Sequence, residues 1–160
     1  MGLYPKGVDE LASDVSAALK KVGFAGDVNE WVMTAKGAKC LSNLRNAMGA
    51  ITNGRGNSEA FMAEVRREAK TVWSAAEKEW EDWTGFNKRI KMSRGTTRMP
   101  KGYEKQRNLG SSWQSLIRGT GNIEAEELNS DVIKLGRLLG ITTPHNELLW
   151  HLADEITEKY

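Results

Sequence analysis

The chain has 160 residues and carries 23 basic against 21 acidic side chains, so its formal net charge is +2. This length is enough for one domain with a real core, and the balanced charge does not call for nucleic acid or a membrane surface as partner. A single cysteine, Cys40, excludes an internal disulfide or a cysteine-rich metal site, while no apolar run is long enough to span a bilayer or serve as a signal core.

The lone cysteine favours a reducing compartment, so we expect a cytoplasmic protein. Few prolines and many Ala, Glu, Lys and Leu residues favour a single all-α domain over the whole chain. Apolar side chains recur every three or four residues along most of the sequence, which is the helical period. On that basis we expect helices over residues 9–22, 29–53, 58–83, 111–118 and 123–139, and from Pro144 onward.

Local signals set several of these boundaries. Gly23 and Gly140 follow the last apolar residue of their helices, where glycine is the usual stop. Ser58 can cap the third helix, and Pro144 stands at a favoured first-turn position. Leu128, Val132, Leu135 and Leu139 are expected to form the buried stripe of the fifth helix, and three tryptophans of the third, at 73, 80 and 83, to pack in the core or at an interface.

One long irregular stretch is expected at 84–110. It holds eight Lys or Arg residues and one acid, Glu104, together with Phe86 and Tyr103. A loop of this length inside a domain is usually functional or disordered. A basic loop with aromatic residues would suit RNA or a phosphate-bearing ligand, and a solvated surface loop is the plainer interpretation.

Three polar residues of the central helix share one face. Lys39, Asn43 and Asn46 stand at i, i+4 and i+7. One cation and two carboxamides at this spacing can hold a small anion that carries carbonyl or hydroxyl groups. A solvated helix face would use the same residue types.

Other local patterns each have a structural alternative. Ser112 at a helix start can bind a carboxylate or only cap the helix, and Glu124 in a first turn can serve a site or only complement the helix dipole. The glycine pairs at 54–56 and 119–121 lack the third glycine of a dinucleotide loop. His145 and His151 are six residues apart, which does not predict a metal site.

Two ordered motifs resemble the 2-dehydropantoate 2-reductase family, also called ketopantoate reductases. The central motif is Lys39-Cys40-Leu41-Ser42-Asn43 with Asn46-Ala47-Met48. The C-terminal motif runs through Ser111-Ser112-Trp113-Gln114, Glu124, Glu126, Leu128-Asn129 and Thr143-Pro144-His145-Asn146. The opening segment is similar to the one that follows the family's dinucleotide domain, so the resemblance covers almost the whole chain.

The resemblance implies roles for individual residues. Lys39 matches the family's proton-donating lysine, and Asn43 and Asn46 match asparagines that bind substrate. Ser112 matches a substrate-binding serine. Glu124 matches the acid at the seam between cofactor and substrate, where it would order the lysine, the substrate or the nicotinamide ribose.

Some positions depart from the family pattern. Trp113 stands in place of the usual Met and Ser115 in place of the usual Asp, while Glu127 and Ser130 replace common Tyr and Gly. None of these changes removes a group that does chemistry, but they leave the 2-oxo acid substrate open. A later substrate asparagine of the family could match Asn53.

The resemblance also implies a two-part enzyme. The helical part would have a fold like the C-terminal domain of 6-phosphogluconate dehydrogenase, and NADP would be bound mainly by an N-terminal Rossmann domain that this sequence lacks. We therefore expect an inactive chain by itself, with its own Rossmann domain and a small 2-oxo acid as partners, and a homodimer is allowed. The rival hypothesis is a non-catalytic interaction module that binds nucleic acid through residues 84–110.

Overall fold

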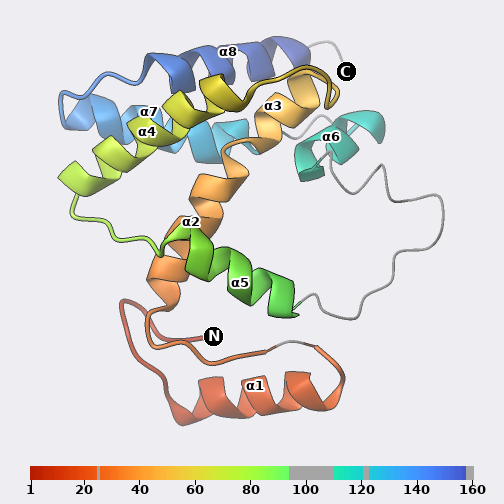
Figure 1. Cartoon of the computed structure of the whole chain (residues 1–160), viewed down its shortest axis with the longest axis vertical. Helices are drawn as coiled ribbons and strands as arrows, with labels where there is room; N and C mark the ends of the chain where they lie inside the picture. The colour runs from red at the N-terminus through yellow and green to blue at the C-terminus, as the bar shows by residue number, and fades with distance from the viewer. Residues whose placement is uncertain (25, 94–109, 121–122, 158–160) are drawn as a thin grey trace. The chain divides into compact units, whose positions relative to one another are not determined.

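The computed structural model describes residues 1–24, 26–93, 110–120 and 123–157, and all regular structure in these ranges is α-helix. This confirms the all-α class. The contacts divide the chain into two compact units, one of residues 1–39 with the described part of 79–98, the other of residues 40–78 with the described part of 99–160. The helices are α1 Glu10–Lys21, α2 Val32–Asn43, α3 Asn46–Ile51, α4 Glu59–Ala75, α5 Trp83–Ser93, α6 Gly110–Ile117, α7 Ala125–Leu138 and α8 Pro144–Thr157 (Figure 1).

In the first unit, α1 has the ends that the sequence predicts. The carboxylate of Asp9 accepts a hydrogen bond of 2.8 Å from the amide of Ala12 and so caps the helix. Gly23 ends it with φ of 84°. The buried residue of α1 is the polar Ser16, whose hydroxyl donates to the carbonyl of Gly26, whereas Leu11 on the apolar stripe is 69% exposed.

The prediction of one central helix over 29–53 is wrong, because the structure has two helices there. α2 ends at Asn43 and α3 begins at Asn46. At Arg45 the backbone has φ of −79° and ψ of −9°, well short of the ψ near −42° of a regular α-helix, so the regular helical pattern is interrupted between Asn43 and Asn46.

The expected helix 58–83 is also too long. α4 ends at Ala75, and Glu77 adopts a left-handed conformation with φ of 54°. The amide of Lys78 bonds to the carbonyl of Trp73 and that of Glu77 to the carbonyl of Ser74, which is the Schellman pattern of a helix C-terminus. Trp80 and Trp83 consequently lie outside α4. Of the expected irregular stretch 84–110, the described start belongs to α5, and residues 94–109 lie outside the described ranges.

Within the second unit, α4, α7 and α8 lie side by side, and α3 packs on α6 and α8 (Figure 1). The buried stripe of α7 is rotated from the expected one, since Leu135 is half-buried and Leu139 exposed, while Val132, Ile133 and Gly136 face inward. Gly136 permits this packing, because a Cβ there would stand 2.8 Å from the carbonyl oxygen of Ile141. The apolar core of the unit consists of Leu41, Leu44, Ala47, Ala50, Met62, Val65, Ala69, Val72, Leu116, Ile123, Ala125, Val132, Ile133, Leu149 and Ala153.

A buried carboxylate joins α4 to the start of α8. Glu68 is only 4% exposed, and it accepts hydrogen bonds from the amides of His145 and Asn146 at 2.9 and 3.0 Å. It also contacts Nδ1 of His145 at 2.7 Å and accepts from Nδ2 of Asn146 at 2.8 Å. Asn129 of α7 completes the group by donating to Oδ1 of Asn146 at 3.1 Å. Glu68 thus caps α8 from another helix and satisfies amides that the first turn leaves without helical partners.

None of the helices in the described part of the chain has the length and apolarity needed to cross a bilayer.

Candidate functional site

Two residues from the two sequence motifs meet in the second unit. Nδ2 of Asn46, the first residue of α3, donates to Oε2 of Glu124 at 2.7 Å. The hydroxyl of Ser111 donates to the same Oε2 at 3.1 Å, and Asn46 Nδ2 lies 3.4 Å from that hydroxyl. Asn46, Ser111 and Glu124 form what we call the carboxylate cluster. It joins the start of α3 to two segments that lie 65 and 78 residues further along the sequence.

Glu124 occupies the N-cap position of α7, but its side chain makes no capping bond. The carboxylate turns instead toward α3 and α6, so simple capping does not explain its orientation. Both of these hydrogen bonds end at Oε2. Among the residues that the structure describes, Oε1 has no hydrogen-bond partner, which leaves one oxygen of a half-buried carboxylate able to accept from a hydroxyl.

The first residue of α6, which lies beside the amide of Asn46, is a glycine. Gly110 has φ of 74°, and a Cβ at this position would stand 3.4 Å from Oδ1 of Asn46. An L-residue here would adopt a strained backbone, while its Cβ would meet the amide of Asn46 at ordinary van der Waals distance. Glycine is therefore suited to this position by its conformation.

Ser112 lies beside the carboxylate cluster in sequence but not in its hydrogen bonding. It is 1% exposed, and its Oγ has no hydrogen-bond partner in the described part of the chain. A buried hydroxyl without a partner is uncommon in a folded protein, and such exceptions often mark functional positions. Its neighbour Ser111, which sequence reasoning did not single out as a site residue, makes the contact with Glu124. No sequence signal separates the two adjacent serines.

Lys39 and Asn43 stand one helical turn apart in α2. Lys39 is exposed and Asn43 is half-buried at the last residue of the helix. Lys39 belongs to the first unit and Asn43 to the second. The convergence of Lys39 with the carboxylate cluster therefore stays a prediction.

The loop after α3 is tied to α6. Asn53 has φ of 51°, and its Oδ1 accepts a hydrogen bond from the indole of Trp113. The tryptophan that replaces the family's methionine thus anchors the loop that carries Asn53. A cavity of about 400 Å³ lies between this loop and α3, and Asn46 lines it. That volume falls in the range of small-molecule sites.

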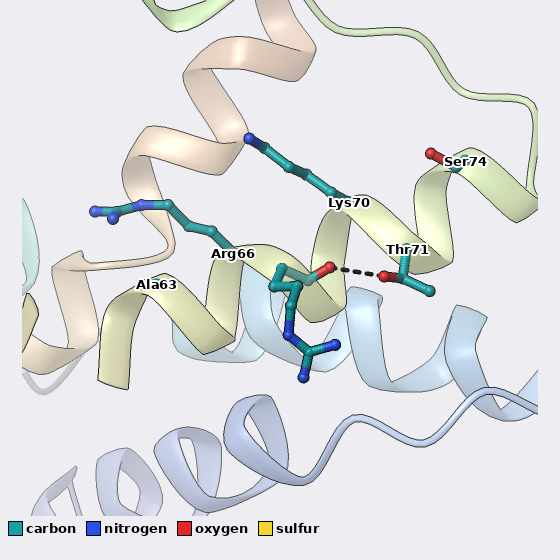
Figure 2. A pocket seen from close by; sticks show the side chains of 6 residues that line it. Ala63, Arg66, Lys70, Thr71 and Ser74 are labelled. Atoms are coloured by element: carbon teal, nitrogen blue, oxygen red, sulfur yellow. Dashed lines mark hydrogen bonds between the residues drawn. The ribbon is translucent and has the colours of Figure 1, made fainter. Parts of the chain in front are cut away.

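A second hollow, of about 500 Å³, lies along the exposed face of α4. Figure 2 shows Arg66 and Lys70 extending to one side, away from Thr71 and Ser74. The hydroxyl of Thr71 already donates to the carbonyl oxygen of Arg67 at 2.9 Å. Polar groups that diverge in this way do not orient a ligand, so this hollow lacks the character of a binding site.

Metal-ligand side chains do not gather in threes anywhere in the ranges that the structure covers. His145 instead contacts Glu68, and its ring packs edge-on against Phe61 with centroids 5.5 Å apart. The motif residues His145 and Asn146 therefore belong to the cap of α8. Glu68 was not predicted, because a single glutamate inside an amphipathic helix carries no distinguishing pattern.

Comparison with solved structures gives seven similar chains, of which two are described here. A 2-dehydropantoate 2-reductase from Methylococcus capsulatus matches 99% of this chain with a TM-score of 0.71 and 20% identity, which shows the fold alone. A PanE/ApbA family ketopantoate reductase from Ralstonia eutropha JMP134 matches 92% with a TM-score of 0.68 and 27% identity. The matches cover 54% and 48% of those proteins, so the chain spans about half their length.

Comparison with curated protein sequences gave no significant match. The model of the family described as "Ketopantoate reductase PanE/ApbA C terminal" matches residues 31–157, which is most of the sequence. This match includes every residue of the two motifs and of the carboxylate cluster. The chain therefore belongs to the family of ketopantoate reductase C-terminal domains.

Proposed function

We propose that this chain is the substrate domain of an NADPH-dependent 2-oxo acid reductase, which converts 2-dehydropantoate to pantoate when an NADP-binding domain accompanies it. The family match supports a role of this kind, and the relative from Methylococcus capsulatus is named as an enzyme of that activity. The observation that carries the proposal is the 2.7 Å hydrogen bond between Asn46 and Glu124, because it joins the two motifs from which the site was predicted.

The reaction needs a hydride at the keto carbon and a proton at the keto oxygen. NADPH, when bound, supplies the hydride. Lys39, as an ammonium on α2, polarises the carbonyl and gives its proton to the oxygen, so the product carries a hydroxyl group and the lysine regains a proton from solvent. Asn43, one turn later, and Asn46 orient the substrate's oxygens through their carboxamides.

Glu124 is the residue of this chain that we assign to the cofactor side. Its Oε2 is held by Asn46 and Ser111, so the carboxylate is fixed and Oε1 can accept from a hydroxyl of the ribose or of the substrate. The buried hydroxyl of Ser112 would gain a partner when a carboxylate or hydroxyl enters the site. The remaining cofactor contacts fall to the other domain, since the described residues contain no strand and hence no dinucleotide fold.

The test is Lys39→Ala in the enzyme assembled from this chain and an NADP-binding domain. Loss of a positioned general acid lowers kcat by roughly 10²–10⁴-fold. NADPH affinity, measured by fluorescence titration, stays near the unmutated value. Lys36→Ala is the matched control, because Lys36 is an exposed lysine of the same helix. Equal kcat values for the two variants, or ketopantoate reduction by this chain alone, would refute the assignment.

A further inference from the structure

The cavity beside Asn46 is polar and has a cationic excess. It is bounded by α3, the loop after it, the start of α4 and Gly110, all within the second unit. Two arginines and one glutamate contribute to its wall, so the lining carries one net positive charge. The lining residues are Arg45, Asn46, Met48, Gly49, Thr52, Gly54, Arg55, Gly56, Asn57, Ser58, Glu59 and Gly110.

The two arginines differ in how they are paired. Arg45 lies 3.3 Å from the carboxylate of Glu59, which is the one acidic group of the lining. Arg55 is exposed and makes no ion pair with any residue in the described ranges. The charges of Arg45 and Glu59 largely neutralise each other, so the guanidinium of Arg55 is the cationic group of the lining that is available to bind a ligand. Planar guanidinium groups bind carboxylates and phosphates through paired N–H donors.

The backbone around Arg55 also favours an anionic ligand. Gly54 and Gly56 have φ of 66° and 78°, so the loop turns tightly on both sides of the arginine. Ser58, which lines the cavity, is the N-cap of the 17-residue α4, and its side chain makes no capping bond. The amino end of a helix carries partial positive charge, which favours an anion, and here the first amide, of Glu59, donates to Oδ1 of Asn57 at 3.1 Å.

We propose that this cavity binds an anionic group, a carboxylate or a phosphate, and that Arg55 supplies the charge that holds it. Asn46 lines the same cavity and bonds Glu124. If the proposed function holds, on which this further step rests, the anionic group is the carboxylate of the 2-oxo acid. Arg55 then determines that the substrate is an acid and not its neutral lactone or ester.

The experiment is an NMR titration of this chain with three probes: pantoate, the neutral pantoyl lactone of the same carbon skeleton, and inorganic phosphate. Pantoate and phosphate shift the amide resonances of Gly54 and Gly56, whereas the lactone leaves them unchanged. Arg55→Gln weakens both anions by about fivefold or more, the scale of one charge-assisted contact at an exposed site. Lys70→Gln is the matched control, since it removes one exposed positive charge from α4 outside the cavity.

The outcomes separate this inference from the proposed function. Equal weakening by Arg55→Gln and Lys70→Gln, or anion-induced shifts confined to other residues, overturns the anion site. Binding of phosphate through Arg55 without competition from pantoate supports the anion site and counts against the 2-oxo acid as its ligand. A loss of reductase activity in Lys39→Ala is independent of either result, because Lys39 does not line the cavity.

Discussion

Replacing Glu68 with glutamine should destabilise the second unit strongly. The carboxylate accepts from four donors at distances between 2.7 and 3.0 Å, two of them backbone amides of the first turn of α8. Glutamine keeps the shape of the side chain but has one oxygen in place of two, and its NH₂ group then faces N–H donors. Hydrogen bonds to charged groups contribute about 1.5–3 kcal/mol each and are not additive, so we expect a loss of about 2–4 kcal/mol.

The pH dependence of this loss gives a second measurement. Burial raises the pKa of Glu68, but the hydrogen bonds from His145 and Asn146 outweigh it and hold the pKa below the ordinary value of 4.5. A carboxyl with a lowered folded-state pKa stabilises the fold above its unfolded pKa, and this contribution is lost as the pH falls through the folded value. Glu68→Gln should therefore remove part of the acid sensitivity, and the variant and the unmutated chain should converge in stability at low pH.

Urea unfolding followed by circular dichroism at neutral and acidic pH measures both effects. Glu155→Gln, an exposed glutamate on α8, is the control and should stay within about 0.5 kcal/mol of the unmutated chain. The reasoning fails if Glu68→Gln behaves like this control at neutral pH. It also fails if the difference between Glu68→Gln and the unmutated chain does not shrink as the pH falls.

Two further variants test the backbone assignments by thermal or urea unfolding. Glu77→Gly should stabilise the chain by about 0.5–1 kcal/mol, because Glu77 has φ of 54° and glycine adopts this conformation without a Cβ clash; Lys78→Gly, one residue later, should give no gain. Gly136→Ala should destabilise by about 1–3 kcal/mol, since the new Cβ would stand 2.8 Å from the carbonyl oxygen of Ile141, and a neutral result would show that α7 packs differently.

The sequence predicts a helix end when the residue at the turn is a glycine, which readily adopts positive φ. α1 and α7 end two residues before Gly23 and Gly140, both of which have positive φ, and both ends were expected from the glycine. α4 ends at Ala75 by the same hydrogen-bond pattern, but the residue with positive φ is Glu77, so no glycine marks the turn. The expected helix consequently ran past its true end to Trp83.

The break between α2 and α3 was missed for a different reason. Neither Leu44 nor Arg45 is a helix breaker, and the apolar period continues through both. Leu44 is buried, Arg45 pairs with Glu59 and Asn46 bonds Glu124, so the local backbone is set by contacts with distant segments. Tertiary contacts of this kind override helix propensity and leave no periodic trace in the sequence.

The two halves of the C-terminal motif have different roles in the structure. Glu124 and Ser111 direct their side chains toward Asn46, and that contact is polar, partly exposed and next to a cavity. Asn146, at the other end of the same motif, is fully buried, and its side-chain amide forms hydrogen bonds with Val65, Glu68 and Asn129. The sequence motif alone does not distinguish the role of Glu124 and Ser111 from that of Asn146. Burial and partners separate them. Asn146 holds α8 against α4 and α7 through Glu68, Val65 and Asn129. Because Glu124 is the N-cap of α7, the hydrogen bond between Asn129 and Asn146 helps to fix the helix next to the candidate carboxylate.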